Sequence, residues 1–376
     1  TSNFRAGTNA GNSIASGGSY NVVVGDEAGT AITTGDFNVA VGFAAGDATT
    51  TGSKNISVGG YALSANTTAS NNTAVGYASL AANTTGSANV AVGSYALDAA
   101  TTALNNTAIG HISLGATTTG ANNTGVGAYV MQANTTGASN VAFGYAALDA
   151  NTTASQNTAV GYNALTATTT GAANTAVGFE ALDANTTAAN NVGIGWRALY
   201  ANTTGTVNVA VGTSALAANT TASYNTALGY AALSTNITGA QNTAVGYSAL
   251  TLATGADNTA VGSQALASVA AGTFNTALGR SAGQAVTTGV QNTLIGGLAG
   301  DALTDADYNI AVGASALSTD TLGSRSVAVG HSALATQNFT SATDVYNTAV
   351  GHGAGYQITT GVQNTLIGGL AGDALT

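Results

Sequence analysis

A serine, three histidines and several aspartates are the residues of this chain whose types could support chemistry. The segment "GRSAG" around Ser281 has the spacing of a hydrolase nucleophile turn, which requires a strand-to-helix turn and later Asp and His partners. The same five positions read "GFAAG" and "GHGAG" elsewhere in the chain. The serine is therefore one variant of a repeated segment, and we predict no catalytic residue and no enzyme activity.

The histidines could bind a metal ion. His111, His331 and His352 occupy the same position of a sequence repeat. The last two lie in consecutive repeats, which places them about 5 Å apart if repeats stack at the spacing of β-strands. Two imidazoles are too few ligands for a metal unless further copies of the chain supply more. We interpret these positions as variable surface residues and predict no metal and no cofactor.

The carboxylates fall into two patterns. "DALTDADYN" brings together Asp301, Asp305 and Asp307, but it lacks the alternating acidic residues and closing Glu of a strong calcium loop. The other aspartates recur at one position of the repeat, seldom in adjacent repeats: Asp47, Asp98, Asp149, Asp183, Asp301 and Asp373. Both patterns are typical of solvated turns, so paired carboxylates for glycoside hydrolysis are not indicated.

Composition excludes several classes of partner. Only 5% of the 376 residues are charged, against about 25% in ordinary proteins, while 45% are hydrophobic. The net charge is −10, and the five basic residues are scattered, so no nucleic-acid footprint exists. No apolar run approaches the roughly 18 residues that span a bilayer. We therefore predict neither nucleic-acid binding nor membrane insertion, and the absence of Pro and Cys suits a continuous backbone ladder.

A repeat of seventeen residues organises these positions. "NTAVGYNALTATTTGAA" runs from Asn157 to Ala173, and "NTAVGFEALDANTTAAN" follows at once. From Asn21 onward the unit Asn-x-x-x-Gly recurs at this spacing, once with Ser in place of Asn; the spacing is shortened before Asn258 and lengthened before Asn347. We number the positions as slots, with this Asn in slot one. We predict an irregular leading coil in 1–20, a continuous array over 21–376, and a short insertion near 337–346.

The slots predict an all-β fold. Slot two is β-branched, slot four apolar, slot nine Leu in most coils and Gly in six, and slot eleven usually Ala, which indicates two short strands with these slots facing inward. Gly in slot five, such as Gly161 and Gly178, indicates positive φ or close backbone approach. Asn in slot one, such as Asn157 and Asn174, indicates a stacked amide ladder. We predict a parallel β-solenoid (β-roll) of about 21 coils, a rod of about 100 Å at strand spacing.

Two surface features suggest contacts. Slot three would face outward and is mostly Ala, so we predict that identical chains associate along the stripe containing Ala159, Ala176 and Ala244. Slot six carries aromatic rings that could hold sugar rings or another apolar partner, unless they simply pack on each other. These candidate contact residues are Tyr145, Tyr162, Phe179, Trp196, Tyr230 and Tyr247.

The repeat also resembles known families. "SVAVGHSALAT" at Ser326–Thr336 and the "NTAVGYxAL" units resemble the head repeats of trimeric autotransporter adhesins. "NTAVGYxALxANTTG" is similar to repeats of bacteriophage tail-fibre proteins. The resemblance implies a left-handed β-roll, a homotrimer, and a location outside the cell, on a cell surface or virion. The adhesin repeat is shorter than the repeat of this chain, so its turn geometry does not carry over.

Together these features predict a structural or adhesive fibre segment, part of a longer fibre, that extends a receptor-binding tip and contacts glycans weakly. The alternative is a module that binds ice or glycan by its side, since "NTTG" and "NTTA" form regular Thr arrays. Side-on binding predicts one chemically uniform exposed face. A shaft predicts variable exposed slots, and slots seven and ten do vary.

Overall fold

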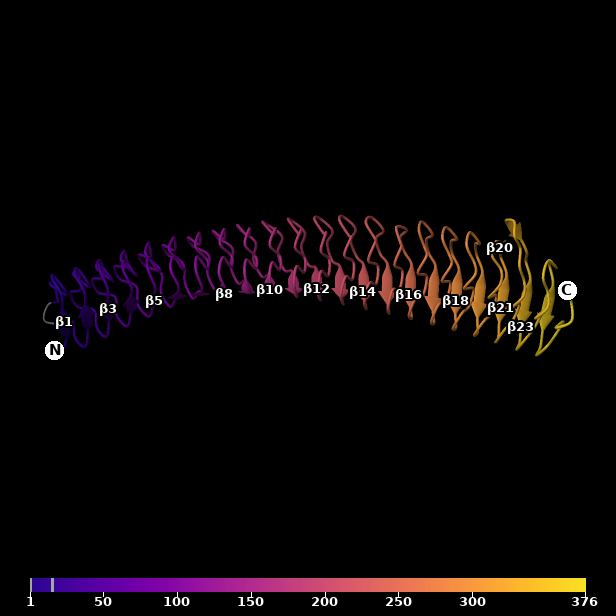
Figure 1. The fold of residues 1–376 in the computed structure, drawn as a ribbon, viewed down its shortest axis with the longest axis horizontal. Helices are drawn as coiled ribbons and strands as arrows, with labels where there is room; N and C mark the ends of the chain where they lie inside the picture. Colours follow the sequence, from indigo (N-terminus) through magenta and orange to yellow (C-terminus); the bar gives the residue numbers. More distant parts are fainter. Residues whose placement is uncertain (1, 15–16) are drawn as a thin grey trace. The chain divides into compact units, whose positions relative to one another are not determined.

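The computed structural model describes residues 2–14 and 17–376, and within these ranges the chain contains strands and turns but no helix. It divides into two compact units, Thr1–Ala189 and Asn190–Thr376. Within each unit the coils follow one another so that the strand of each coil lies beside the strand of the next (Figure 1).

Almost every strand has three residues, in slots two to four. The strands of the first unit are β1 Phe4–Ala6, β2 Val22–Val24, β3 Val39–Val41, β4 Ile56–Val58, β5 Thr73–Val75, β6 Val90–Val92, β7 Thr107–Ile109, β8 Thr124–Val126, β9 Val141–Phe143, β10 Thr158–Val160 and β11 Thr175–Val177. The strands of the second unit are β12 Val192–Ile194, β13 Val209–Val211, β14 Thr226–Leu228, β15 Thr243–Val245, β16 Thr259–Val261, β17 Thr276–Leu278, β18 Thr293–Ile295, β19 Ile310–Val312, β20 Gly323–Ser324, β21 Val327–Val329, β22 Thr343–Asp344, β23 Thr348–Val350 and β24 Thr365–Ile367.

Neighbouring coils pair in parallel, slot against slot. In the first unit Ala159 lies opposite Ala142 and Ala176. In the second unit Thr243 pairs with Thr259, so the register survives the shortened coil between them. The leading segment pairs with its neighbour as the other coils do. Strand β1 pairs with β2, and Asn3 accepts a hydrogen bond from the backbone N–H of Asn21 at 2.8 Å. The predicted parallel β-solenoid with a seventeen-residue coil is confirmed.

The second strand predicted in each coil is absent from the described residues. Slots seven and nine have left-handed backbone, as at Tyr61 and Leu63 with φ of 58° and 54°, and this breaks an extended segment. The backbone hydrogen bonds on this side of the coil are of two kinds. Leu63 N–H donates to the next coil at Ser79, whereas Asn66 N–H donates back within its own coil to Leu63. This side of the coil is therefore a chain of tight turns.

The predicted inward and outward faces of the strand were wrong. Ala159, Ala176 and Ala244 are fully buried, while slots two and four, such as Thr158 and Val160, are partly exposed. The interior contains slots one, three, eight, nine, twelve and fifteen, and it is so narrow that Ala is needed where strand and turns approach each other. The Ala stripe lies in the core and cannot be a contact between chains.

The structure confirms both reasons that the sequence suggested for Gly in slot five, positive φ and close backbone approach. From Gly25 to Gly368 these residues have φ between 126° and 143°, which side chains rarely adopt. A Cβ on Gly161 would also lie 2.3 Å from the carbonyl oxygen of Gly178 in the next coil. Each coil therefore needs Gly at this corner for its own conformation and for the approach of its neighbour.

Two columns of buried Asn run through the interior. In slot one, Asn157 accepts a hydrogen bond from the N–H of Asn174 at 2.9 Å and donates to the carbonyl of Gly171 at 3.0 Å. The amide ladder predicted for this column is confirmed. Slot twelve forms a second column, in which Asn151 donates to Asn134 at 2.7 Å. These bonds give most of the buried amide atoms a partner; the exceptions include the Oδ1 atoms of Asn83 and Asn151 and the Nδ2 atom of Asn225.

The core packing of the coils occurs in two versions, which differ in slots nine and twelve. Most coils have Leu in slot nine and a polar or small residue in slot twelve. Five of the six coils with Gly in slot nine have a large apolar residue in slot twelve instead, at Ile32, Val286, Leu303, Ile358 and Leu375. A Cβ on Gly283 would lie 2.6 Å from Leu294 and 3.4 Å from Val286, so these side chains occupy the space that a slot-nine Leu fills elsewhere.

The insertion predicted near 337–346 contributes one strand, β22, to the second, two-stranded sheet. Residues Thr343–Asp344 of β22 pair with β20. Beside it, Ser326 replaces Asn in slot one, and the buried Gln337 donates to both Ser326 at 3.0 Å and Asp320 at 2.6 Å. Asn347 in turn donates to Gln337 at 2.9 Å. This network supplies buried side-chain hydrogen bonds at the place of the missing Asn.

Candidate functional surfaces

The outward side of the strands forms a surface that we call the strand face, made of slots two and four. In all 21 coils slot two is Thr, Val or Ile, and slot four is Val, Ile, Leu or Phe. Several of these side chains are more than a third exposed, including Ile56 at 41% and Leu228 at 48%. An uncharged, largely apolar surface that recurs on every coil is typical of an interaction site.

A second surface is a run of aromatic side chains in the first unit, which we call the aromatic ladder. It has one ring on each of nine successive coils: Phe43, Tyr61, Tyr77, Tyr95, His111, Tyr129, Tyr145, Tyr162 and Phe179. Neighbouring ring centroids are 5.3 to 6.4 Å apart. The first six contacts are edge-to-face and the last two are nearly parallel.

The structure brings together only part of the predicted aromatic strip. Tyr145, Tyr162 and Phe179 stack in succession in the first unit. Tyr230 and Tyr247 form a separate stacked pair in the second unit, with centroids 5.5 Å apart. Trp196 also lies in the second unit, where the guanidinium of Arg197 lies 4.7 Å from its ring centre.

The first six rings of the ladder were missed from the sequence, because the ring alternates between slots six and seven. Slot six lacks a ring at Gly60, Ser94 and Ala128, and on those coils slot seven supplies Tyr61, Tyr95 and Tyr129. Reading slot six alone therefore finds only every other ring of this run. Counting rings per coil, whatever the slot, would have identified the ladder.

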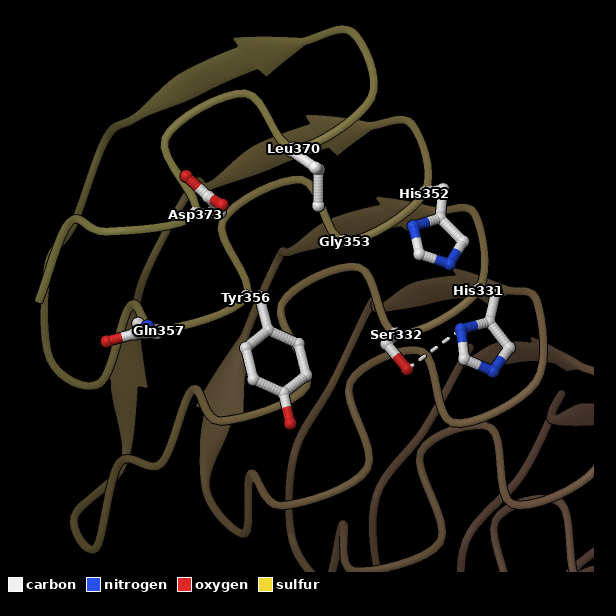
Figure 2. Close-up of a pocket in the computed structure, with 8 residues that line it drawn as sticks. All are labelled: His331, Ser332, His352, Gly353, Tyr356, Gln357, Leu370 and Asp373. Atoms are coloured by element: carbon white, nitrogen blue, oxygen red, sulfur yellow. Dashed lines mark hydrogen bonds between the residues drawn. The ribbon is translucent and has the colours of Figure 1, made fainter.

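A pocket of about 360 Å³ lies on the corresponding surface of the last coils. Figure 2 shows His331 and His352 side by side at one edge, with Tyr356, Gln357 and Asp373 across from them. The two imidazoles stack with centroids 5.2 Å apart, and a hydrogen bond of 3.1 Å joins His331 Nδ1 to the Ser332 hydroxyl. The pocket shows that slots six, seven and ten face the same surface.

The carboxylates of slot ten are half-buried on this surface. Burial raises the pKa of Asp47, Asp98, Asp149 and Asp301, because removal from water disfavours the charged form. One oxygen of Asp47, Asp149 and Asp301 is buried without a hydrogen-bond partner. These groups are spaced along the coils rather than paired.

The other residues considered from the sequence make no assembled site. Ser281 is only 3% exposed and lies in slot seven of a turn. Within the described parts of the chain, no three His, Cys, Asp or Glu side chains gather as a metal site requires. The search of residues 2–14 and 17–376 also finds no helix that could cross a membrane.

A column of exposed Thr lies in a turn after the ladder slots. Slot fourteen is Thr on ten successive coils of the first unit, from Thr34 to Thr187, and each of these side chains is exposed. The preceding Thr of slot thirteen is partly buried, and its hydroxyl donates to the next coil, as from Thr135 to the carbonyl of Thr152 at 2.9 Å. One of the two Thr columns is therefore structural and the other faces solvent.

No protein-family model matches this chain, and the search of curated proteins gave no match.

Proposed function

We propose that this chain is a structural segment of a surface fibre, of the kind carried by phage tails or bacterial adhesins, and that copies of the chain assemble through their strand faces. The strand face carries this proposal. It is uniform and uncharged on every coil, and such a surface is stabilised when a matching surface covers it.

The size of the strand face supports assembly. A three-residue strand at a coil spacing of about 4.8 Å presents roughly 50 Å² per coil, so 21 coils present about 1,000 Å². Stable protein interfaces bury about 800 Å² on each partner. The resemblance to trimeric adhesins makes three the expected number of copies, and it supports a location outside the cell for a fibre that extends a receptor-binding tip.

The mass of the purified chain in solution tests this assembly. Sedimentation should give three times the single-chain mass of 36.0 kDa. Val160→Lys with Val177→Lys should reduce it toward the mass of one chain, because the added charges would be buried without partners. Thr153→Lys with Thr170→Lys adds the same charge on exposed slot fourteen and should leave the mass unchanged. A wild-type monomer would overturn the proposal.

The exposed Thr column favours a second candidate, side-on binding to ice. Its members are chemically identical over ten successive coils, as a repeating solid surface would require. Thermal hysteresis of the wild-type chain, abolished by Thr102→Lys and Thr119→Lys, would support this function. Its absence at high protein concentration would leave the fibre as the single proposal.

A further inference from the structure

We propose that the aromatic ladder is a binding surface for an uncharged linear polysaccharide, which lies along the coils with its sugar rings against successive side chains. This role is separate from the fibre assembly, because the ladder and the strand face occupy different slots of the coil. It holds for a single chain as well as for a trimer.

The fold itself does not require these rings. Coils of the second unit have the same corner glycine and paired strands without any ring in slots six and seven, as at Thr213–Ser214 and Ser263–Gln264. Gly212 and Gly262 have φ of 132° and 135°, within the range of the ladder coils. The nine-ring run is therefore an addition to a coil that is stable without it.

The rings of the aromatic ladder form a continuous surface, although the slot that supplies the ring is not the same on every coil. Each ladder coil has one ring in slots six and seven, and the ring moves between these two slots without leaving a gap. Packing of rings on each other leaves them accessible, since Tyr77 is 50% exposed and Tyr145 is 49% exposed. A polymer that touches every coil would use such continuity, whereas a small ligand would need one pocket.

The charged and hydrogen-bonding groups near the aromatic ladder indicate which kind of polymer it binds. Slots six, seven and ten share one surface, and on the ladder coils slot ten includes Asp47, Asp98 and Asp149. The basic residues of the first unit, Arg5 and Lys54, are in other slots. An acidic polymer would meet only like charge there. The C–H faces of neutral sugars suit the negative faces of the rings, and their hydroxyls can donate to the carboxylates.

Titration of the full chain with cello-oligosaccharides and manno-oligosaccharides tests this proposal, with oligogalacturonides as acidic controls. Affinity for at least one neutral series should rise with length up to about nine sugars, one for each ring, because every added sugar gains a contact. The acidic series should bind at least about tenfold more weakly. Failure of both neutral series to bind, or equal binding of the acidic series, would overturn the proposal.

Matched variants locate the site. Tyr77→Ala with Tyr145→Ala should weaken binding at least about tenfold, and Phe at the same two positions should retain most of it, because the ring face is kept. Tyr230→Ala with Tyr247→Ala removes two exposed rings from the second unit and should change affinity less than about twofold. Circular dichroism controls for folding. An equal loss in the second-unit variant would place binding elsewhere and reject the ladder as its site.

Discussion

The first unit repeats its coil with few departures, whereas the second unit carries most of the variation in the chain. The second unit contains the shortened coil before Asn258, the insertion with β20 and β22, Ser in place of Asn at position 326, and four of the six coils with Gly in slot nine, from Gly283 to Gly372. Both units keep the corner glycine and the parallel register. Most changes inside the coil are accompanied by a compensating change in a neighbouring slot, whereas slots seven and ten on the outside vary without one.

The largest effect should come from the corner glycine, and it should be the same in both units. Gly161→Ala and Gly279→Ala would each place a methyl group within 2.5 Å of the next coil's carbonyl oxygen, at an unfavourable φ. Each should destabilise its coil by more than about 4 kcal/mol. Native-state hydrogen exchange of the full chain would measure this. A loss in one unit alone would show that the corners are not equivalent.

The next effect concerns the two core versions. Leu148→Gly removes a buried side chain from the first unit, and relief of its left-handed backbone offsets part of the loss, so destabilisation of about 3 kcal/mol is expected. Adding Asn151→Ile copies the second-unit pattern and should restore at least about 1 kcal/mol. Thermal unfolding of the single and double variants tests this coupling. Simple additivity of two losses would contradict the compensation.

A smaller effect should follow from the Asn column. Asn157→Ser in the first unit removes buried hydrogen bonds to Gly171 and Asn174, which should destabilise it by about 2 kcal/mol. Thr168→Gln in the same coil should recover part of this loss, because Asn151 in the coil before it has a buried oxygen without a partner. This pair imitates Ser326 and Gln337. If hydrogen exchange shows no recovery, the network of Ser326 and Gln337 stabilises only the coils of its own unit.

The smallest effect is the dependence on pH. The raised pKa values of Asp47, Asp98 and Asp149 mean that the folded first unit holds protons more tightly than the unfolded chain. This contribution is fully present below the unfolded pKa of about 3.9 and is lost as pH rises through the folded pKa. Solvent screens each half-exposed group, which limits it to less than about 1 kcal/mol.

Unfolding between about pH 4 and pH 7 measures this contribution. Replacing all three residues with Asn should flatten the pH dependence of the first unit. Asp301→Asn alone should have the smaller effect in the second unit, where it is the one half-buried aspartate with a raised pKa among the described residues. An unchanged profile in the triple variant would assign the pH dependence to net charge instead.

The sequence predicted the features that depend on one slot repeating. The coil length, the parallel register, Gly161 at the corner and the Asn157 ladder follow from columns that must match from coil to coil. It did not predict which side of the strand faces inward, because Thr and Val in slots two and four are equally suited to a core or to a covered surface. The narrow interior decides this in favour of Ala159 and its neighbours.

Features that involve two slots together were harder to predict. The aromatic ladder uses slots six and seven in alternation, and the core versions exchange volume between slots nine and twelve. Neither column is regular alone. The turns at Leu63 and Tyr61 were missed for another reason, since left-handed backbone at bulky residues is disfavoured locally and is held here by hydrogen bonds to adjacent coils.

The hydrogen bonds of each coil within a unit join it to the coils immediately before and after it, as at Asn157 with Asn140 and Asn174. A coil can therefore complete these bonds without a partner from a distant part of the chain. We expect the coils to form in the order in which the ribosome makes them or a secretion channel releases them. Each finished coil then serves as the template for the next. Long chains of this kind could then fold without ever exposing more than about one unfinished coil.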